Sequence, residues 1–136
     1  MFPRSKEEMI EELQKWVQDL NDRDEDIIIV VEGKKDIESL KNIGVECRMV
    51  HMNKGLSVLT YLESIKSNAR PFEDLGDFDT MIILTDWDRT GGRLAHKLKD
   101  ACQNLAVTFD MNPRMQLAKL TGKWVRDVES LDALMG

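Results

Sequence analysis

The chain has 136 residues, of which 42% are apolar and 32% are charged. This composition is typical of one folded domain and excludes a disordered chain. Its net charge of −6, from 25 acidic and 19 basic residues, argues against a protein that coats nucleic acid through bulk positive charge. No signal-peptide segment is recognisable, and no apolar run approaches the roughly 20 residues of a membrane span. We therefore expect a cytoplasmic protein that does not contact a membrane.

The first quarter of the chain predicts a helix followed by a buried strand. Ser5 and Glu8 have the spacing of a capping box, and apolar residues follow at helical intervals, which predicts a helix over residues 5–21. We assign residues 1–25 to this N-terminal helical segment. Residues 27–31 are all β-branched and apolar, as expected for a strand that is covered on both faces in a parallel sheet.

Helix and strand patterns alternate in the middle of the chain. Apolar spacing predicts a helix over residues 37–43, closed by Gly44, and a second strand over residues 45–51. Apolar residues at every third position between 56 and 65 predict another helix. Residues 67–78, which contain a proline and a glycine, predict the longest loop.

The remaining segments complete an α/β pattern. A strand is predicted over residues 80–85, a helix over 94–102 and a short fourth strand over 105–109, with two short helices around Thr121 and Gly122. This order predicts a sheet of about four mostly parallel strands with helices on both faces and an extra N-terminal helix.

Acidic residues follow two of the predicted strands. Glu32 comes directly after the first strand, and Asp86 and Asp88 come after the third. The carboxyl ends of parallel strands lie along one edge, so these carboxylates converge if their strands are neighbours. Mg²⁺ suits such a cluster, because it takes one or two carboxylates and leaves positions for water and phosphate oxygens. Gly33 and Gly91 would let the backbone turn sharply and a ligand approach closely.

Basic residues surround the same strand ends. Lys34 and Lys35 follow the first strand, and Arg89 and Arg93 follow the third, all near predicted helix N-termini that favour anions. A bound cation surrounded by basic side chains is the arrangement expected of a phosphate-binding site. Trp87, between the two aspartates, has two interpretations: it stacks on a base, or it packs against the neighbouring helix.

Both acidic motifs resemble those of Toprim domains. Residues 28–36 look like the hydrophobic strand, Glu-Gly and Asp of the first Toprim motif, and residues 84–91 look like the Asp-x-Asp and glycine of the second. Toprim domains occur in type IA and type II topoisomerases, bacterial-type primases, OLD-family nucleases, RecR proteins and ribonuclease M5. The resemblance implies a Rossmann-like Toprim core over residues 26–110, within a single domain of residues 1–136 that ends in short helices over 111–136.

The resemblance also implies roles for individual residues. Glu32 matches the glutamate assigned general acid/base or metal-linked work, and Asp86 and Asp88 match the aspartates that bind Mg²⁺, with Mn²⁺ as an alternative. Asp36 matches an acidic position that serves as a metal ligand or has a structural role. Thr90 departs from the pattern, since many relatives have a third acidic residue there, and one-metal binding is the resulting expectation.

The site residues named so far comprise a catalytic Glu32, metal ligands Glu32, Asp86 and Asp88, and phosphate or nucleic-acid contacts from Gly33, Lys34, Lys35, Arg89, Gly91 and Arg93. The leading hypothesis is an enzyme for Mg²⁺-dependent phosphodiester cleavage or phosphoryl transfer on nucleic acid, with RNA favoured over DNA, as the resemblance to ribonuclease M5 implies. The alternative is a non-catalytic module that binds nucleic acid or a nucleotide through Mg²⁺ in a processing or repair assembly. A homodimer and a larger processing complex are both compatible with the sequence.

Overall fold

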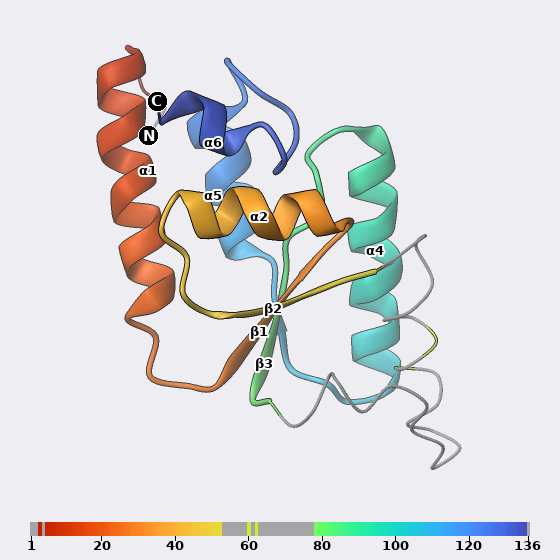
Figure 1. The fold of residues 1–136 in the computed structure, drawn as a ribbon. Coiled ribbons are helices and arrows are strands. Elements are labelled where there is room, and N and C mark those ends of the chain that lie inside the picture. Colours follow the sequence, from red (N-terminus) through yellow and green to blue (C-terminus); the bar gives the residue numbers. More distant parts are fainter. Residues whose placement is uncertain (1–2, 4, 53–59, 61, 63–77, 136) are drawn as a thin grey trace.

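The computed structural model describes residues 3, 5–52, 60, 62 and 78–135. Its elements in chain order (Figure 1) are α1 (Lys6–Asn21), β1 (Ile27–Val31), α2 (Lys34–Asn42), β2 (Arg48–His51), β3 (Thr80–Ile83), α4 (Arg89–Asn104), β4 (Phe109–Asp110), α5 (Asn112–Thr121) and α6 (Leu131–Leu134). The predicted helix over 56–65 and loop over 67–78 lie largely outside the described residues. Within the described part of the chain, no helix is both long and apolar enough to cross a membrane.

The sheet confirms the predicted parallel α/β architecture. Its four strands are all parallel and lie in the order β2-β1-β3-β4. Val30 of β1 is paired with Ile83 of β3, so the two strands that precede the acidic motifs are direct neighbours. From β1 the chain moves to β2 on one side and then returns to β3 on the other, which makes the β1–β3 boundary a topological switch point. Ligands of open α/β sheets bind at such a point.

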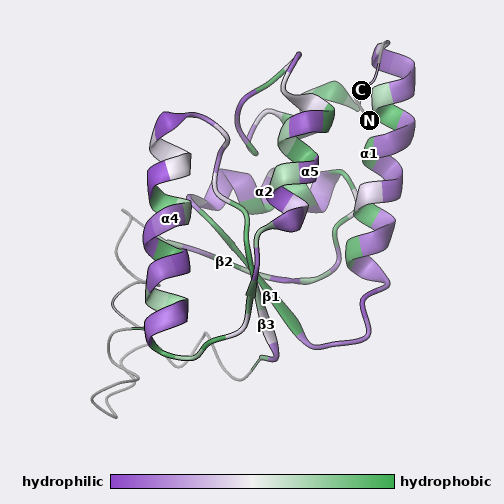
Figure 2. Cartoon of the chain, turned by 180° about the vertical axis from the view of Figure 1, so that it is seen from behind, coloured by the Kyte–Doolittle hydropathy of each residue, from purple (hydrophilic) through white to green (hydrophobic). Residues whose placement is uncertain are grey.

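Strand β1 is buried on both faces, as its β-branched sequence predicts. Ile27, Ile29 and Val31 face a core formed with α1, α2, α5 and α6. Ile28 and Val30 face the opposite core, to which α4 contributes Ala95, Leu98 and Cys102. This alternation follows from the two-residue repeat of a strand. Figure 2 shows the resulting pattern, with hydrophobic strands at the centre and hydrophilic outer faces on the helices.

Three strand boundaries differ from the prediction. The strand expected over 80–85 ends at Ile83, although Leu84 N–H still donates to Val30 O. The fourth strand was expected over 105–109, but β4 comprises Phe109–Asp110, because the preceding residues close α4 instead. The N–H of Val107 donates to the carbonyl of Cys102 at 2.8 Å, and Ala106 takes a positive φ of 56°. Similarly, β2 begins at Arg48 and not at residue 45, because Val45 N–H donates to Leu40 O in closing α2.

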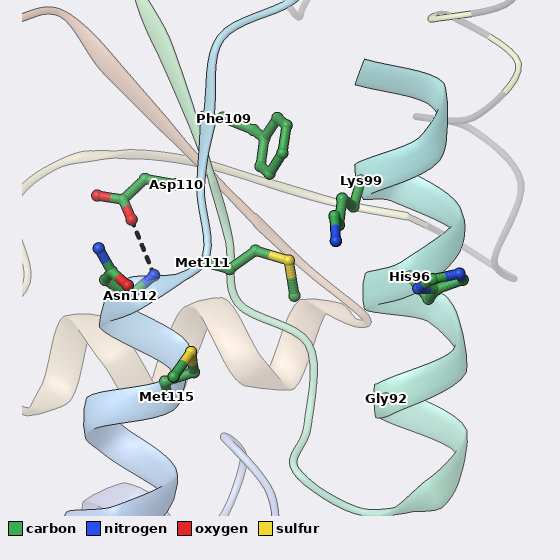
Figure 3. Close-up of a pocket in the computed structure, with 8 residues that line it drawn as sticks. All are labelled: Gly92, His96, Lys99, Phe109, Asp110, Met111, Asn112 and Met115. Carbon is green, nitrogen blue, oxygen red and sulfur yellow. Dashed lines mark hydrogen bonds between the residues drawn. The ribbon is translucent and has the colours of Figure 1, made fainter. Parts of the chain in front are cut away.

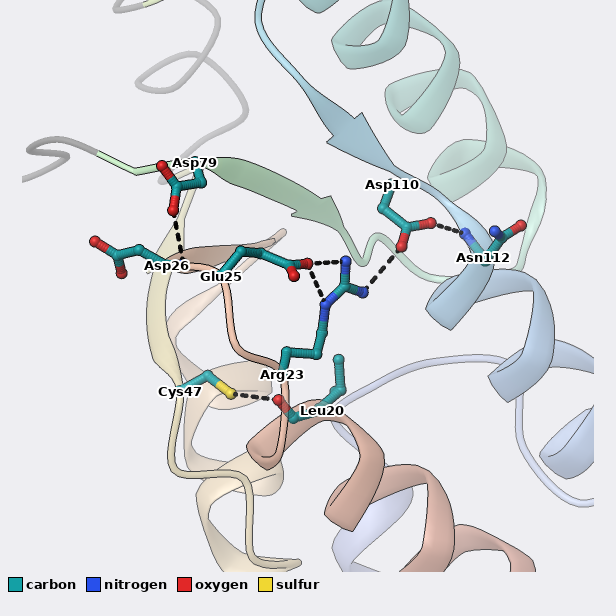
Figure 4. A network of polar contacts seen from close by, with 8 residues as sticks. All are labelled: Leu20, Arg23, Glu25, Asp26, Cys47, Asp79, Asp110 and Asn112. Carbon is teal, nitrogen blue, oxygen red and sulfur yellow. Dashed lines mark hydrogen bonds and ion pairs between the residues drawn. The ribbon is translucent and has the colours of Figure 1, made fainter.

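Polar contacts cap the start of α1 and attach the loop that follows it to the sheet. The predicted cap of α1 is present, since Ser5 Oγ accepts a 3.1 Å hydrogen bond from Glu8 N–H. After α1, Arg23 forms ion pairs with Glu25 and with Asp110 of β4, the latter at 2.9 Å (Figure 4). These contacts connect the N-terminal helix with the strand at the edge of the sheet.

Candidate metal and phosphate site

The two acidic motifs meet at the carboxyl ends of β1 and β3. Leu84 N–H donates to the carbonyl of Val30 at 2.9 Å, so the chain stays beside β1 until the aspartates are reached. Glu32 Oε2 then accepts a 2.7 Å hydrogen bond from the backbone N–H of Asp86. The structure thus brings together two residues from different motifs at the switch point of the sheet.

Asp86 is half-buried among other acidic groups. Its Oδ1 accepts a 2.8 Å hydrogen bond from Val128 N–H. The pKa of Asp86 is raised to about 8, chiefly by burial and also by the charges of Glu32 and Asp36 and a side-chain contact with Glu32, while the Val128 hydrogen bond opposes these effects. The Asp86 carboxyl group therefore retains a proton near neutral pH unless a cation compensates its charge.

Asp88 and Gly91 shape the turn between β3 and α4. Asp88 is the N-cap of α4, and its Oδ1 accepts a 2.7 Å hydrogen bond from Gly91 N–H. A Cβ atom on Gly91 would lie only 1.8 Å from the carbonyl oxygen of Asp86, so this position requires glycine. Thr85 Oγ1 donates to Gly91 O at 2.6 Å. These contacts hold the aspartate turn against the start of α4.

Asp36 stabilises the other turn of the site. It is buried in the first turn of α2, and its Oδ2 accepts a 3.0 Å hydrogen bond from Gly33 N–H. Burial raises the pKa of Asp36, and the Gly33 hydrogen bond opposes that effect while the charges of Glu32 and Glu129 add to it. Asp36 therefore orders the backbone that follows Glu32 and also contributes negative charge to the site.

Arg114, in the first turn of α5, was missed by the sequence analysis. Its Nε donates to Thr85 O at 2.9 Å, and its Nη2 donates to Asp86 O at 2.7 Å. Burial lowers the pKa of Arg114, and the charges of Glu32, Asp86 and Asp88 act in the opposite direction. This cation thus lies within the field of all three predicted metal ligands. The sequence marks it only as a basic residue one turn after the fourth strand.

The C-terminal segment, residues 122–130 between α5 and α6, also forms part of the site. Trp87 N–H donates to Arg126 O at 3.1 Å, and Trp87 Nε1 donates to Val125 O at 2.8 Å. Trp87 thus packs inward, against this segment and the core of the α1 face. The N–H of Val128, three residues after Val125, is the one that donates to Asp86 Oδ1. The sequence carried no signal for this role, because backbone donors are present at almost every position.

The predicted basic residues lie in the first two turns of the two helices that start at the site. Lys34 and Lys35 are exposed at the start of α2, and Lys35 Nζ lies 3.9 Å from Glu129 Oε1. Arg89 is exposed in the first turn of α4, and Arg93 is exposed in its second turn. Among the described residues, no ion pair involves Lys34, Arg89 or Arg93. These three side chains therefore remain available to an anionic ligand.

The carboxylates offer hard oxygen ligands suited to Mg²⁺. Within the described part of the chain, no three His, Cys, Asp or Glu side chains are arranged to hold a metal ion together. Glu32 and Asp86, however, form a contacting pair in which Asp86 retains a proton. A divalent cation bound to this pair would replace that proton and relieve the repulsion of the two charges. The pair fits a site where phosphate and water complete the coordination.

The family profile described as Toprim domain matches residues 27–119, which extend from β1 into α5 and include Arg114. The chain therefore belongs to the Toprim domain family, and this membership implies a metal-dependent function related to nucleic acid. It is 35% identical over 128 residues to the UPF0292 protein of Methanosarcina barkeri, covering 94% of this chain and 81% of the relative. It is 29% identical over 126 residues to the UPF0292 protein of Methanocaldococcus jannaschii, covering 93% and 91% of the two chains.

A solved structure of a protein from Aquifex aeolicus has a similar fold. It aligns with a TM-score of 0.57 and 24% sequence identity, over 94% of this chain and 99% of that one. At this identity the alignment shows that the two chains share a fold.

Proposed function

We propose that this chain is an Mg²⁺-dependent enzyme that cleaves phosphodiester bonds in nucleic acid. The observation that carries the proposal is the 2.7 Å hydrogen bond between Glu32 Oε2 and Asp86 N–H, which sets a candidate proton acceptor beside a candidate metal ligand. Family membership supports the metal and the class of substrate. Structured RNA is the favoured substrate, since the arrangement of a small Toprim chain resembles that of ribonuclease M5.

The residues support a hydrolysis in which water attacks phosphorus. Glu32 accepts a proton from the water as its oxygen bonds to phosphorus, and the bond to the departing sugar oxygen breaks. The departing oxygen then receives a proton from Glu32 or from solvent. Asp86 and Asp88 are the candidate metal ligands, and bound Mg²⁺ would supply charge stabilisation at the phosphate.

Other residues would orient the substrate and hold the turn. Lys34 and Arg89 begin α2 and α4, and Arg93 lies one turn into α4. Their charges and the helix N-termini favour a phosphate backbone. Arg114 holds the backbone of Thr85 and Asp86 and partly offsets the local negative charge. Its position supports a role in keeping Asp86 aligned, without requiring contact with the reacting atoms.

A non-catalytic module is the second candidate, and one observation favours it. Asp88 Oδ1 is engaged in capping α4, and the described residues provide no three-ligand metal group. A chain with one weakly held cation would bind a nucleic-acid phosphate through Mg²⁺ without cleaving the strand. Asp86 would be essential to such binding, whereas Glu32 would contribute only its negative charge.

A paired substrate and variant assay separates the two functions. Labelled structured RNA, single-stranded DNA and duplex DNA are incubated with the protein and Mg²⁺ or Mn²⁺. Glu32→Gln should lower turnover by about 10²- to 10⁴-fold, because the carboxylate that accepts the proton is lost. Glu38→Gln, at an exposed position of α2, is the matched control and should retain turnover.

The same panel defines the result that contradicts the enzyme. Binding without turnover, together with loss of Mg²⁺ affinity in Asp86→Asn, would favour the module. Asp19→Asn, at an exposed position of α1, controls for the change of net charge. If neither Glu32→Gln nor Asp86→Asn changed metal binding or turnover, the placement of the site would be wrong.

A further inference from the structure

A groove of about 500 Å³ lies between α4 and residues 109–115, which comprise β4 and the start of α5 and are called the β4–α5 segment. Figure 3 shows α4 on one side and the β4–α5 segment on the other, with the side chains of Phe109 and Met111 pointing into the space between them. Its lining from α4 comprises Gly92, His96 and Lys99, which lie on successive turns of one face. None of the site residues predicted from the sequence lines this groove.

One end of the groove adjoins the acidic site. Gly92, which lines it, directly follows the glycine that packs against Asp86. A Cβ atom on Gly92 would lie 3.9 Å from Arg114 Nη2, and the same Nη2 donates to Asp86 O. The Arg114 guanidinium thus contacts the aspartate turn and also lies beside the glycine at this end of the groove.

The lining combines flat apolar surface with polar groups. Phe109 supplies an aromatic ring, Met111 and Met115 supply polarisable thioethers, and Asn112 has a side-chain amide that can donate and accept hydrogen bonds. Met115 is 50% exposed, an unusual state for a large apolar side chain. Aromatic and thioether groups accept the face of a planar ring, and stacking of this kind tolerates different bases.

A cation lies across the groove from these apolar groups. Lys99 is partly buried on α4, and its side chain is directed toward the β4–α5 segment (Figure 3). In the described part of the chain, no ion pair involves Lys99, whereas the neighbouring His96 lies 3.5 Å from Asp100. An anionic ligand with a planar ring would satisfy both the charge and the apolar surface.

We propose that this groove binds the nucleoside adjoining the phosphate that lies at the acidic site. The inference rests on the proposed function and adds a base-binding subsite to it. The base packs against Phe109 and the two methionines, and Lys99 faces the next phosphate along the strand. A protein partner is disfavoured because one end of the groove adjoins the acidic site and the groove carries a cation at its apolar surface.

Calorimetric titration with two probes tests the subsite in the presence of Mg²⁺. Inorganic phosphate reports the acidic site alone, and a ribodinucleotide with its internal phosphate and one terminal phosphate reports the site together with the groove. Lys99→Gln and Met115→Glu should each weaken dinucleotide binding by about 5- to 100-fold, as expected for loss of one stacked or ion-paired group. Affinity for inorganic phosphate and for Mg²⁺ should stay unchanged.

Lys97→Gln is the matched control, because Lys97 is exposed on the same helix and does not line the groove. The subsite is overturned if Lys99→Gln and Met115→Glu bind the dinucleotide as the wild type does, a result that would leave the groove to a protein partner. That outcome leaves the proposed function standing provided that Asp86→Asn still abolishes Mg²⁺-dependent phosphate binding. Loss of the proposed function has a different signature, in which the wild type binds neither probe in a metal-dependent way.

Discussion

Arg114 donates a 2.7 Å hydrogen bond to the backbone carbonyl of Asp86, although the two residues belong to different elements and only Asp86 lies in an acidic motif. A second bond of 2.9 Å, to Thr85 O, makes the contact bidentate. The guanidinium therefore fixes two successive carbonyls of the turn that presents the aspartates. Helix α5, which contributes no motif residue, is thus a component of the site.

Replacement of Arg114 should destabilise the protein. Arg114→Lys keeps a positive charge but cannot reproduce the planar fork, so we expect a loss of about 1–3 kcal/mol in the free energy of unfolding. Arg114→Met also removes the charge that opposes the carboxylates, and its loss should be larger above the pKa of Asp86 than below it. Urea denaturation at one pH below and one pH above the pKa of Asp86 measures how the loss of stability differs. Lys119→Met, exposed on the same helix, should have little effect at either pH.

Two adjacent glycines should respond oppositely to alanine. Gly91→Ala places a Cβ atom 1.8 Å from Asp86 O, and the required backbone shift should cost about 1–3 kcal/mol. Gly92→Ala brings its Cβ atom no closer than 3.9 Å to another element, where the neighbour is Arg114 Nη2, and should stabilise the protein by about 0.5–1 kcal/mol. Thermal denaturation of both variants tests this. Equal stability of the two would contradict the close approach of α4 to the aspartate turn.

The stability of the metal-free protein should depend on the titration of Asp86. Its pKa rises from an ordinary 3.8 to about 8 in the folded state, so the folded state binds the proton more tightly. The resulting stabilisation is complete below about pH 4 and is lost as the pH rises through about 8. Asp86→Asn should remove this component, leaving a smaller decline in stability between those values. Parallel pH profiles for the wild type and Asp86→Asn would contradict the shift.

Mg²⁺ should compete with the same proton. Addition of Mg²⁺ at about pH 7 should raise the melting temperature and release up to about one proton per bound ion, because the ion requires a deprotonated carboxylate. Calorimetric titration in buffers of different ionisation enthalpy measures the released protons. In Asp86→Asn the proton release should disappear, whereas Asp19→Asn should behave like the wild type.

Loss of the Trp87 indole N–H should loosen the C-terminal segment. Trp87→Phe retains an aromatic ring but removes the 2.8 Å hydrogen bond to Val125 O, at an expected cost of about 0.5–1.5 kcal/mol. The Val128 N–H that holds Asp86 should then exchange faster with solvent, which hydrogen exchange measures. Trp124→Phe is the matched control, since no hydrogen bond from the Trp124 indole is present among the described residues. Unchanged exchange at Val128 in Trp87→Phe would argue against the coupling.

Local patterns in the sequence were sufficient for most of the fold. The apolar run Ile27–Val31 can only be buried on both faces, and this predicts a central parallel strand with helices on either side. Capping at Ser5 and helical spacing after it likewise located α1. The fourth strand was placed too early because apolar residues after α4 resemble a strand, while a positive φ at Ala106 redirects the chain. Such a turn depends on how the helix end packs.

By itself, the sequence determined the acidic motifs and the strands that precede them, because a strand's apolar repeat and the residues that follow it are local properties. The tertiary structure decided which strands are neighbours, and so brought Glu32 to the backbone of Asp86. It also decided that Arg114 and the N–H of Val128 hold the aspartate turn. Their roles depend on where α5 and the C-terminal segment pack, and contacts between residues distant in the chain leave no periodic pattern in one sequence.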